Sequence, residues 1–351
     1  MSVLTVFSLA QSAQWDAVVR SFREYDVYWL SGYVRAFQLH GDGEPLLFFY
    51  EDAGVRGINV VMRRDVADDP HFRGTLEKGR YFDLSTPYGY GGWIIEGENA
   101  APLFCAYEAW LKRHAIISEF ARFHPMLQNH TRCAAFYDVL PLGEVVHMEL
   151  SSPEDIWENL TSKNRNMIRK AEKNGIRIFN GRFPEIYETF REIYNDTMDK
   201  DRAHAYYYFG EAFYASLLND LPENAQVFWA QKDKTVIAAS VLLAANGRMN
   251  YHLSGSRREY GSLAPTNLLL YRAALWGCAN GCKTLFLGGG VGSGEDSLFR
   301  FKRAFYRGEL NRFHIGRSVY DPETYGSLVR MRNVSESGFF PLYRCPAKAN
   351  G

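Results

Sequence analysis

Apolar and polar residues follow two different periods along the first half of the chain. Alternation with a period of two predicts extended segments at residues 35–40, 45–50 and 57–62 and strands at 80–84 and 117–123. Apolar residues at helical spacing predict helices near residues 13–22 and 102–114. We therefore expect a mixed α/β unit in this half.

The second half repeats this order of elements. A hairpin pairs residues 226–231 with 235–244 across Lys232-Asp233-Lys234, and a strand at 249–253, a long apolar helix and a strand at 284–287 follow. The two halves share the pattern without visible sequence identity. We expect an α/β protein with mixed sheets, divided into two domains near residues 140–144, with residues 145–150 opening the second domain.

A helical pattern near the start of the second half carries a row of cations. Residues 152–174 predict one helix, with Ser152 and Asp155 as an N-terminal capping pair and Gly175 as a left-handed C-terminal residue. Arg165, Arg169 and Lys173 recur at four-residue steps along one side of it. Such a row can hold phosphates, or it can be the solvated face of an ordinary surface helix.

Composition limits the partners and the compartment. Lys plus Arg and Asp plus Glu number 40 each in 351 residues, so an anion site must be a local feature. Five scattered cysteines argue against a disulfide framework and for a reducing compartment. The first ten residues lack the basic region of a signal peptide, and no apolar run is long enough to span a membrane. We expect a cytosolic protein.

The glycine run Gly288-Gly289-Gly290-Val291-Gly292-Ser293-Gly294, followed by Phe301-Lys302-Arg303-Ala304-Phe305, carries a family resemblance. Together with the strands and helix upstream and the basic helix at 164–173, it resembles the FemABX family of peptidoglycan aminoacyl transferases. The resemblance implies two tandem GNAT-like acyltransferase domains. The first would cover residues 1–144 and be completed by 312–351, and the second would cover residues 145–311.

The resemblance also implies roles for residues of the second half. Lys302 would stabilise the charged intermediate of acyl transfer, with Phe301 bordering the donor, and Tyr251 would contact substrate in a cleft. Arg202 and Tyr206 would grip the diphosphate of a nucleotide-linked acceptor, although Tyr207 or Tyr208 could be the counterpart. Each role has a structural alternative. Lys302 could be a surface lysine of an amphipathic helix, and Tyr251 could be a core residue. The segment with Arg202 and Tyr206 could be the aromatic start of a helix that packs on the core.

The first half offers weaker candidates. Asp83 precedes the loop at 85–92 and is a candidate base beside the incoming amine, with a structural role as the alternative. Tyr88 and Tyr90 could line a cleft between the domains. We expect Gly89, Gly91 and Gly92 to permit positive φ angles.

Other chemistries lack their motifs. The glycine run continues into Glu295, so it has neither the Gly-Lys-Ser/Thr of a P-loop nor a G-x-G-x-x-G spacing. Cys278 and Cys282 have no second cysteine pair, which disfavours a zinc site. The sequence has no G-x-S-x-G motif, which argues against the nucleophile elbow of a serine hydrolase. The loop that binds coenzyme A in GNAT proteins has a sequence of the type R/Q-x-x-G-x-G/A at the start of a helix. Residues 258–263 keep its first glycine but end in Leu263.

We therefore expect an aminoacyltransferase that needs no resident cofactor. The resemblance implies aminoacyl-tRNA as the donor, bound by Arg165, Arg169 and Lys173, and a UDP-linked or lipid-linked cell-envelope precursor as the acceptor. Peripheral association with the inner face of the membrane is compatible with a lipid-linked acceptor. Two alternatives stay open. They are a CoA-dependent N-acyltransferase acting on a nucleotide sugar or polysaccharide precursor, and a scaffold that binds without catalysis.

Overall fold

A computed structural model describes residues 3–52, 54–334 and 338–346. The chain divides into two compact units, the first made of Met1–Leu142 with Phe313–Gly351 and the second of Gly143–Arg312. The sequence predicted these two boundaries after residues 144 and 311, and the structure has them after residues 142 and 312. No helix among the described residues is long and apolar enough to cross a membrane.

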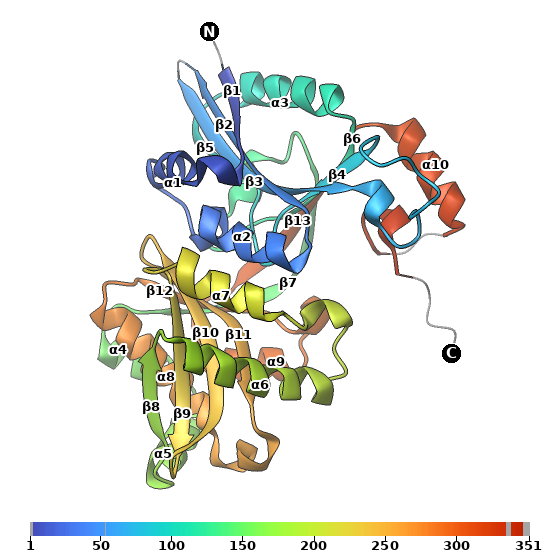
Figure 1. Ribbon diagram of the computed structural model, residues 1–351. Coiled ribbons are helices and arrows are strands. Elements are labelled where there is room, and N and C mark those ends of the chain that lie inside the picture. The colour runs from blue at the N-terminus through green and yellow to red at the C-terminus, as the bar shows by residue number, and fades with distance from the viewer. Residues whose placement is uncertain (1–2, 53, 335–337, 347–351) are drawn as a thin grey trace. The chain divides into compact units, whose positions relative to one another are not determined.

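The first unit is built on a mixed sheet (Figure 1). Its strands follow the order β1-β2-β3-β4-β6-β13, with β5 paired to β3, and only β4 and β6 run parallel to each other. The strands are β1 (Val3–Phe7), β2 (Glu44–Asp52), β3 (Val55–Asp65), β4 (Phe82–Ser85), β5 (Ile94–Gly97), β6 (Ile116–Arg122) and β13 (Asn311–Val319). The helices are α1 (Ser12–Arg20), α2 (Ser31–His40), α3 (Ala101–Arg113) and α10 (Pro322–Arg332).

The second unit has a sheet of the same plan. Its strands follow the order β7-β12-β11-β10-β9-β8, and only β11 and β12 run parallel. The strands are β7 (Asp138–Glu149), β8 (Arg177–Gly181), β9 (Ala225–Lys232), β10 (Thr235–Ala245), β11 (Arg248–Ser256) and β12 (Thr284–Gly288). The helices are α4 (Pro153–Asn159), α5 (Ser162–Lys173), α6 (Pro184–Lys200), α7 (Glu211–Asp220), α8 (Pro265–Ala279) and α9 (Ser297–Arg303).

The two sheets confirm the expected duplication. In each unit a hairpin leads to a third strand, a helix crosses over, and the next strand pairs in parallel with that third strand. In the first unit the crossover helix is α3 and the last strand is β13, which follows the whole second unit in the chain. Each unit is therefore a complete α/β layer structure.

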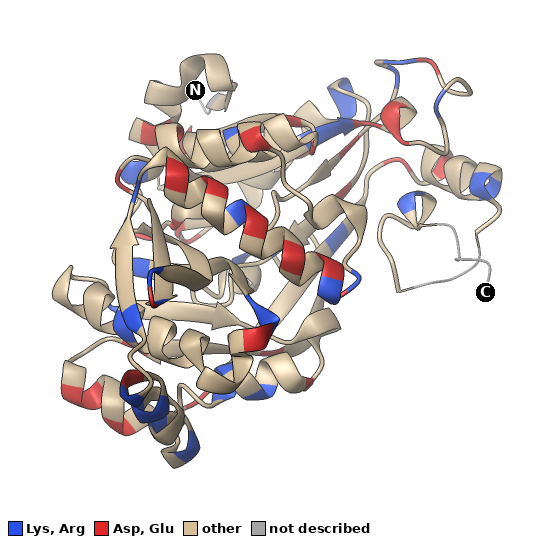
Figure 2. Cartoon of the chain, turned by 60° about the horizontal axis from the view of Figure 1, so that its bottom comes forward, with Lys and Arg blue, Asp and Glu red and all other residues tan. Residues whose placement is uncertain are grey.

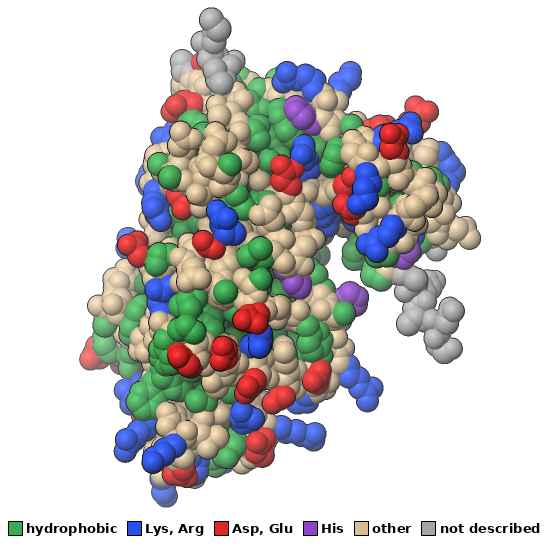
Figure 3. Space-filling model, in the orientation of Figure 1, with side chains coloured by type: hydrophobic (Ala, Val, Ile, Leu, Met, Phe, Trp, Pro, Cys, Tyr) green, Lys and Arg blue, Asp and Glu red, His purple; other side chains and the backbone are tan. Residues whose placement is uncertain are grey.

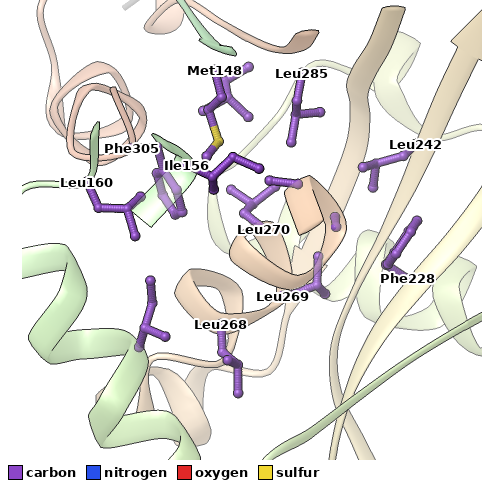
Figure 4. Packing of buried hydrophobic residues seen from close by; sticks show 14 of the residues in the cluster. Met148, Ile156, Leu160, Phe228, Leu242, Leu268, Leu269, Leu270, Leu285 and Phe305 are labelled. Atoms are coloured by element: carbon purple, nitrogen blue, oxygen red, sulfur yellow. The ribbon is translucent and has the colours of Figure 1, made fainter. Parts of the chain in front are cut away.

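The core of the second unit lies between the sheet and the helices α4, α5, α8 and α9. Helices α6 and α7 cover the opposite face (Figure 1). Leu268, Leu269 and Leu270 of α8 lie at the centre of this core, with Leu160 and Phe305 together on one side of them and Phe228 and Leu242 on the other (Figure 4). All of these side chains are at most 2% exposed, so burial of apolar surface holds α8 and α9 against the strands.

Two predicted elements are wrong. Residues 35–40 belong to helix α2 rather than to a strand. This helix is buried around most of its circumference, so its apolar residues do not show a clean helical period. Residues 152–174 form two helices instead of one, because Leu160 and Thr161 are extended and the Thr161 hydroxyl caps α5 by accepting the Asn164 N–H at 3.3 Å.

The predicted ends of this segment are confirmed. The Ser152 hydroxyl accepts the Asp155 N–H at 3.0 Å, and Gly175 has a φ of 74°. Of the glycines in the loop of the first unit, Gly89 and Gly92 have positive φ angles. Gly91 does not, and it is needed for space, because a Cβ there would lie 2.8 Å from the Thr86 methyl group.

Candidate functional site

The two parallel strands of the second unit separate after a short contact. Strands β11 and β12 pair only over Arg248–Asn250 and Thr284–Phe286. Beyond these residues β11 stays with β10, with a bulge between the partners of Val241 and Leu242, while β12 stays with β7 as far as Gly288. The sheet therefore opens between β11 and β12 beyond Asn250 and Phe286.

The corresponding place in the first unit is closed. Strands β4 and β6 pair over all four residues of β4, and the Thr86 N–H then donates to the Phe120 carbonyl at 3.0 Å. The loop stays on β6, since the Gly91 N–H donates to the Arg122 carbonyl at 2.7 Å. Among the strands that the structure describes, the parallel pair of the second unit is thus the open one.

Tyr88 and Tyr90 lie in this closed loop of the first unit. The Tyr88 ring stacks on Phe37, and the Tyr90 ring packs edge-on against Tyr28 and Phe313. Burial raises the pKa of Tyr90 to about 12. These contacts are those of an aromatic cluster that fills the space beside β6.

Lys302 lies at the open end of β12. Its side chain is buried, and its Nζ donates a hydrogen bond to the Gly289 carbonyl at 2.7 Å. Asp296 begins helix α9 by accepting the Phe299 N–H at 2.8 Å, and it also accepts the Val291 N–H at 3.1 Å. The glycine loop folds tightly around this carboxylate, because a Cβ on Gly290 would collide with it.

Burial and charge have opposite effects on the Lys302 ammonium. Burial lowers the pKa of Lys302 to about 8, while the nearby Asp296 carboxylate raises it. The group is thus still mainly a cation at pH 7, but in a poorly solvated position where its field is strong. Phe301 and Phe305 contact each other with ring centroids 5.4 Å apart and pack α9 against the core.

The basic helix α5 and helix α9 are tied together at Ala304. The Ala304 carbonyl accepts the Thr161 N–H at 3.0 Å and the Asn164 amide at 3.2 Å. Asn267 of α8 donates in turn to the Asn164 side chain at 2.8 Å. Sequence reasoning missed both Asn164 and Asp296. Only Asp296 left a signal, as a capping residue type just before an apolar helical run.

The predicted cation row is only partly available. The Arg165 guanidinium turns back to α4 and donates to the Leu160 carbonyl at 2.9 Å, so it satisfies the C-terminal carbonyls of that helix. Arg169 lies over the Trp157 ring at 5.1 Å and, like Lys173, is exposed. The row is therefore not three free cations, because one of them has a structural partner.

Arg202 and Tyr206 follow the end of α6. Arg202 is exposed and has a left-handed backbone with a φ of 50°, and Tyr206 lies in a short 3-10 turn of Ala205–Tyr207. The two residues thus belong to an irregular connection rather than to one helix face. The neighbouring Tyr208 hydroxyl donates to Asp199 at 2.7 Å.

Tyr251 is the first β11 residue beyond the contact with β12. It pairs with Leu242 next to the bulge and packs partly buried against the core around α8. Burial raises the pKa of Tyr251, and hydrogen bonding with Ser254 and Ser240 opposes this rise. The Tyr251 ring thus packs partly on the core, and its position in β11 places it at the edge of the opening.

Asp83 lies within a buried ion cluster of the first unit. Its carboxylate is fully buried and accepts hydrogen bonds from Arg64 at 2.7 Å, Arg344 at 2.5 Å and the Tyr343 hydroxyl at 2.9 Å. Burial alone would raise the pKa of Asp83, but Arg64 and Arg344 lower it below its ordinary value. A carboxylate held in this way is a poor proton acceptor at neutral pH.

The face of the described residues that Figure 3 shows has no large area of one charge sign. Lys and Arg as well as Asp and Glu occur in both units (Figure 2), and the face shown in Figure 3 has charges of both signs among hydrophobic side chains. Within the described ranges, no three His, Cys, Asp or Glu side chains are grouped so that they could hold a metal ion. The buried ammonium beside the open strands is thus the strongest local feature.

Comparison with known proteins finds a family match in the second unit. Residues 161–303 match the family described as acetyltransferase (GNAT) domain. No curated protein matches the chain. The matched range contains both β11 and β12 as well as Lys302.

Solved structures match nearly the whole chain in fold. FemX superimposes with a TM-score of 0.66 at 12% identity, covering 93% of this chain and 99% of its own. L-PGS from Bacillus licheniformis has a TM-score of 0.56 at 13% identity, with coverages of 93% and 97%. A tandem GNAT protein from the clavulanic acid biosynthesis pathway has a TM-score of 0.52 at 7% identity, with coverages of 92% and 100%. The predicted tandem GNAT fold is confirmed.

Proposed function

We propose that this protein transfers an aminoacyl group from an activated donor to an amine, at the place where β11 and β12 separate. The observation that carries the proposal is the buried Lys302 ammonium at the end of β12. Attack of an amine on an ester creates an oxyanion, and one positioned donor typically stabilises such an intermediate by about 3 kcal/mol. Lys302 supplies that charge without a large cost of solvent reorganisation.

Aminoacyl-tRNA is the donor that we propose. Coenzyme A would need free backbone N–H groups around its pyrophosphate at the start of α8. There Pro265 has no N–H, and the Ala264 N–H already donates to the Gly261 carbonyl at 3.1 Å. Leu263 is packed against the core. The exposed Arg169 and Lys173 are the members of the basic row that could contact tRNA phosphates.

A UDP-linked or lipid-linked cell-envelope precursor is the acceptor that we propose. The resemblance to FemABX proteins and the similarity in fold to FemX support it. Arg202 and Tyr206 would bind its diphosphate, because an exposed guanidinium can pair with two phosphate oxygens at once. Tyr251 and Phe301 would border the reacting groups. Asp83 has no part in this proposal, since both of its carboxylate oxygens accept hydrogen bonds from arginine side chains.

A second candidate is a CoA-dependent N-acyltransferase acting on a nucleotide sugar or polysaccharide precursor. The match of residues 161–303 to an acetyltransferase domain family favours it. A scaffold that binds such a precursor without catalysis is the third.

Donor titration separates these candidates. We expect charged tRNA to bind with an affinity that falls as salt rises, with a slope set by a few phosphate contacts, and to give covalent product with a UDP-linked muropeptide. Acetyl-CoA should bind weakly. Product from acetyl-CoA, with no salt-sensitive tRNA binding, would establish the second candidate instead. Binding of the precursor without product from either donor would establish the scaffold.

A further inference from the structure

A buried histidine lies in line with the last paired residues of β11 and β12. In the strand registers Asn250 of β11 pairs with Phe286 of β12, and Phe286 pairs with His147 of β7. Directly paired residues share one face of a sheet, so the three side chains form a row across it. Their face is opposite to Met148 and Leu285, which belong to the core around α8. His147 therefore lies beside the point where the sheet opens.

His147 has an unsatisfied ring nitrogen. Its side chain is 8% exposed, and within the part of the chain that the structure describes no hydrogen-bond partner lies within reach of its Nδ1. Buried polar atoms in folded proteins are nearly always paired, so an orphaned nitrogen at this place indicates a partner that arrives with a ligand. The imidazole ring lies against the Tyr306 ring with centroids 4.8 Å apart.

Burial keeps the imidazole ring neutral although a carboxylate lies on the same face of the sheet. Glu149 shares its face of β7, Thr284 and Arg248 lie on the same face of β12 and β11, and Tyr306 covers the ring. Burial lowers the pKa of His147, while Glu149 opposes this effect. The imidazole is thus an unprotonated base at pH 7.

The position of His147 suits the proposed reaction. Gly289, whose carbonyl holds Lys302, follows Phe286 by three residues, a span of at most about 10 Å along the strand. An acyl carbon bound between the two residues would have a cation near its oxygen and a base near the attacking nitrogen. Lys302 cannot be that base while it is protonated, and Asp83 is held in ion pairs of the first unit.

We propose that His147 accepts the proton of the acceptor amine during acyl transfer, an inference that rests on the proposed function. The nitrogen lone pair forms a bond to the acyl carbon, the carbonyl π pair moves to oxygen, and the N–H proton passes to the imidazole. When the carbonyl re-forms, the bond to the ester oxygen breaks, and that oxygen takes the proton from the imidazolium. Amine and ester become amide and alcohol, and His147 returns to its neutral state.

The test combines substitution with chemical rescue. His147→Ala should lower kcat by about a hundredfold, the lower range for a general base, and added imidazole should restore part of the rate. His147→Gln fills the space and should show the loss without rescue. The matched control is His71→Ala, which removes a histidine of the first unit that pairs with Asp69. It should keep the wild-type rate with and without imidazole.

Each outcome decides the inference. If His147→Ala transfers at a rate within twofold of wild type, His147 is not the base, while the proposed function stands. A loss that imidazole does not restore, in a variant with a lowered Tm and an unchanged pH profile, would assign His147 a structural role. If the wild-type protein transfers no group from either donor, the proposed function fails and the inference fails with it.

Discussion

At the scale of single residues, Lys302 makes activity depend on pH. Only the ammonium can stabilise an oxyanion, and burial has lowered the pKa of Lys302 to about 8. The cation is therefore present below this pH and is lost as pH rises through it. We expect kcat of the wild-type protein to fall above pH 8, as a pH–rate profile with charged tRNA would measure.

Two variants of Lys302 test this dependence. Lys302→Met should lower turnover by about a hundredfold with acceptor affinity changed only a few fold, because only the charged intermediate loses its partner. Lys302→Arg keeps a charge that does not titrate, so any residual activity should lack the fall above pH 8. An unchanged turnover in Lys302→Met would remove the residue from the mechanism.

At the scale of elements, two cations of α5 that look alike in the sequence have different surroundings. Arg165 satisfies carbonyls at the end of α4, whereas Lys173 is exposed. We expect Arg165→Ala to lower the free energy of unfolding by about 1–2 kcal/mol, near the lower end for a charged hydrogen bond because the side chain is partly exposed. Urea unfolding measures this loss.

Lys173→Ala is the matched variant on the same helix. It should change the free energy of unfolding by less than about 0.5 kcal/mol. It should also reduce the slope of log K for tRNA binding against log salt concentration by about 1, because one phosphate contact is lost. Equal stability of the two variants would show that the contacts of Arg165 with α4 contribute little.

At the scale of the whole molecule, Asp83 ties the C-terminal segment to the first unit. Arg344 and Tyr343 reach this buried carboxylate from about 260 residues further along the chain. We expect Asp83→Asn to cost about 2–3 kcal/mol of stability, because it removes the buried negative charge that pairs with the partly buried Arg64 and Arg344. The pKa of Asp83 is lower in the folded state, so its stabilising effect is present above about pH 4 and is lost as pH falls further.

An exposed ion pair is the control for Asp83. Asp68→Asn breaks a contact with Lys78 in which both side chains are more than half exposed, and it should change stability by less than about 1 kcal/mol. If Asp83→Asn instead kept its stability and lost turnover, Asp83 would have the role of a base, one of the two roles considered from sequence.

The sequence by itself determined the features that depend on neighbours along the chain. The hairpin of β9 and β10, the caps at Ser152 and Gly175, and the glycine loop before α9 all follow from local spacing and backbone preference. The repeated order of elements was sufficient to predict two mixed α/β domains. Helix α2 escaped prediction because burial on nearly all sides removes the periodic signal.

Only the tertiary structure decided which of these elements form a site. The sheet opens beyond Asn250 and Phe286 because β11 and β12 keep different neighbours, and strand registers of this kind join residues far apart in the chain. The same is true of the partners of Asp83 and the environment of His147, neither of which has a local sequence pattern. A single sequence records local spacing, whereas desolvation, ion pairing and strand separation depend on groups that only folding brings together.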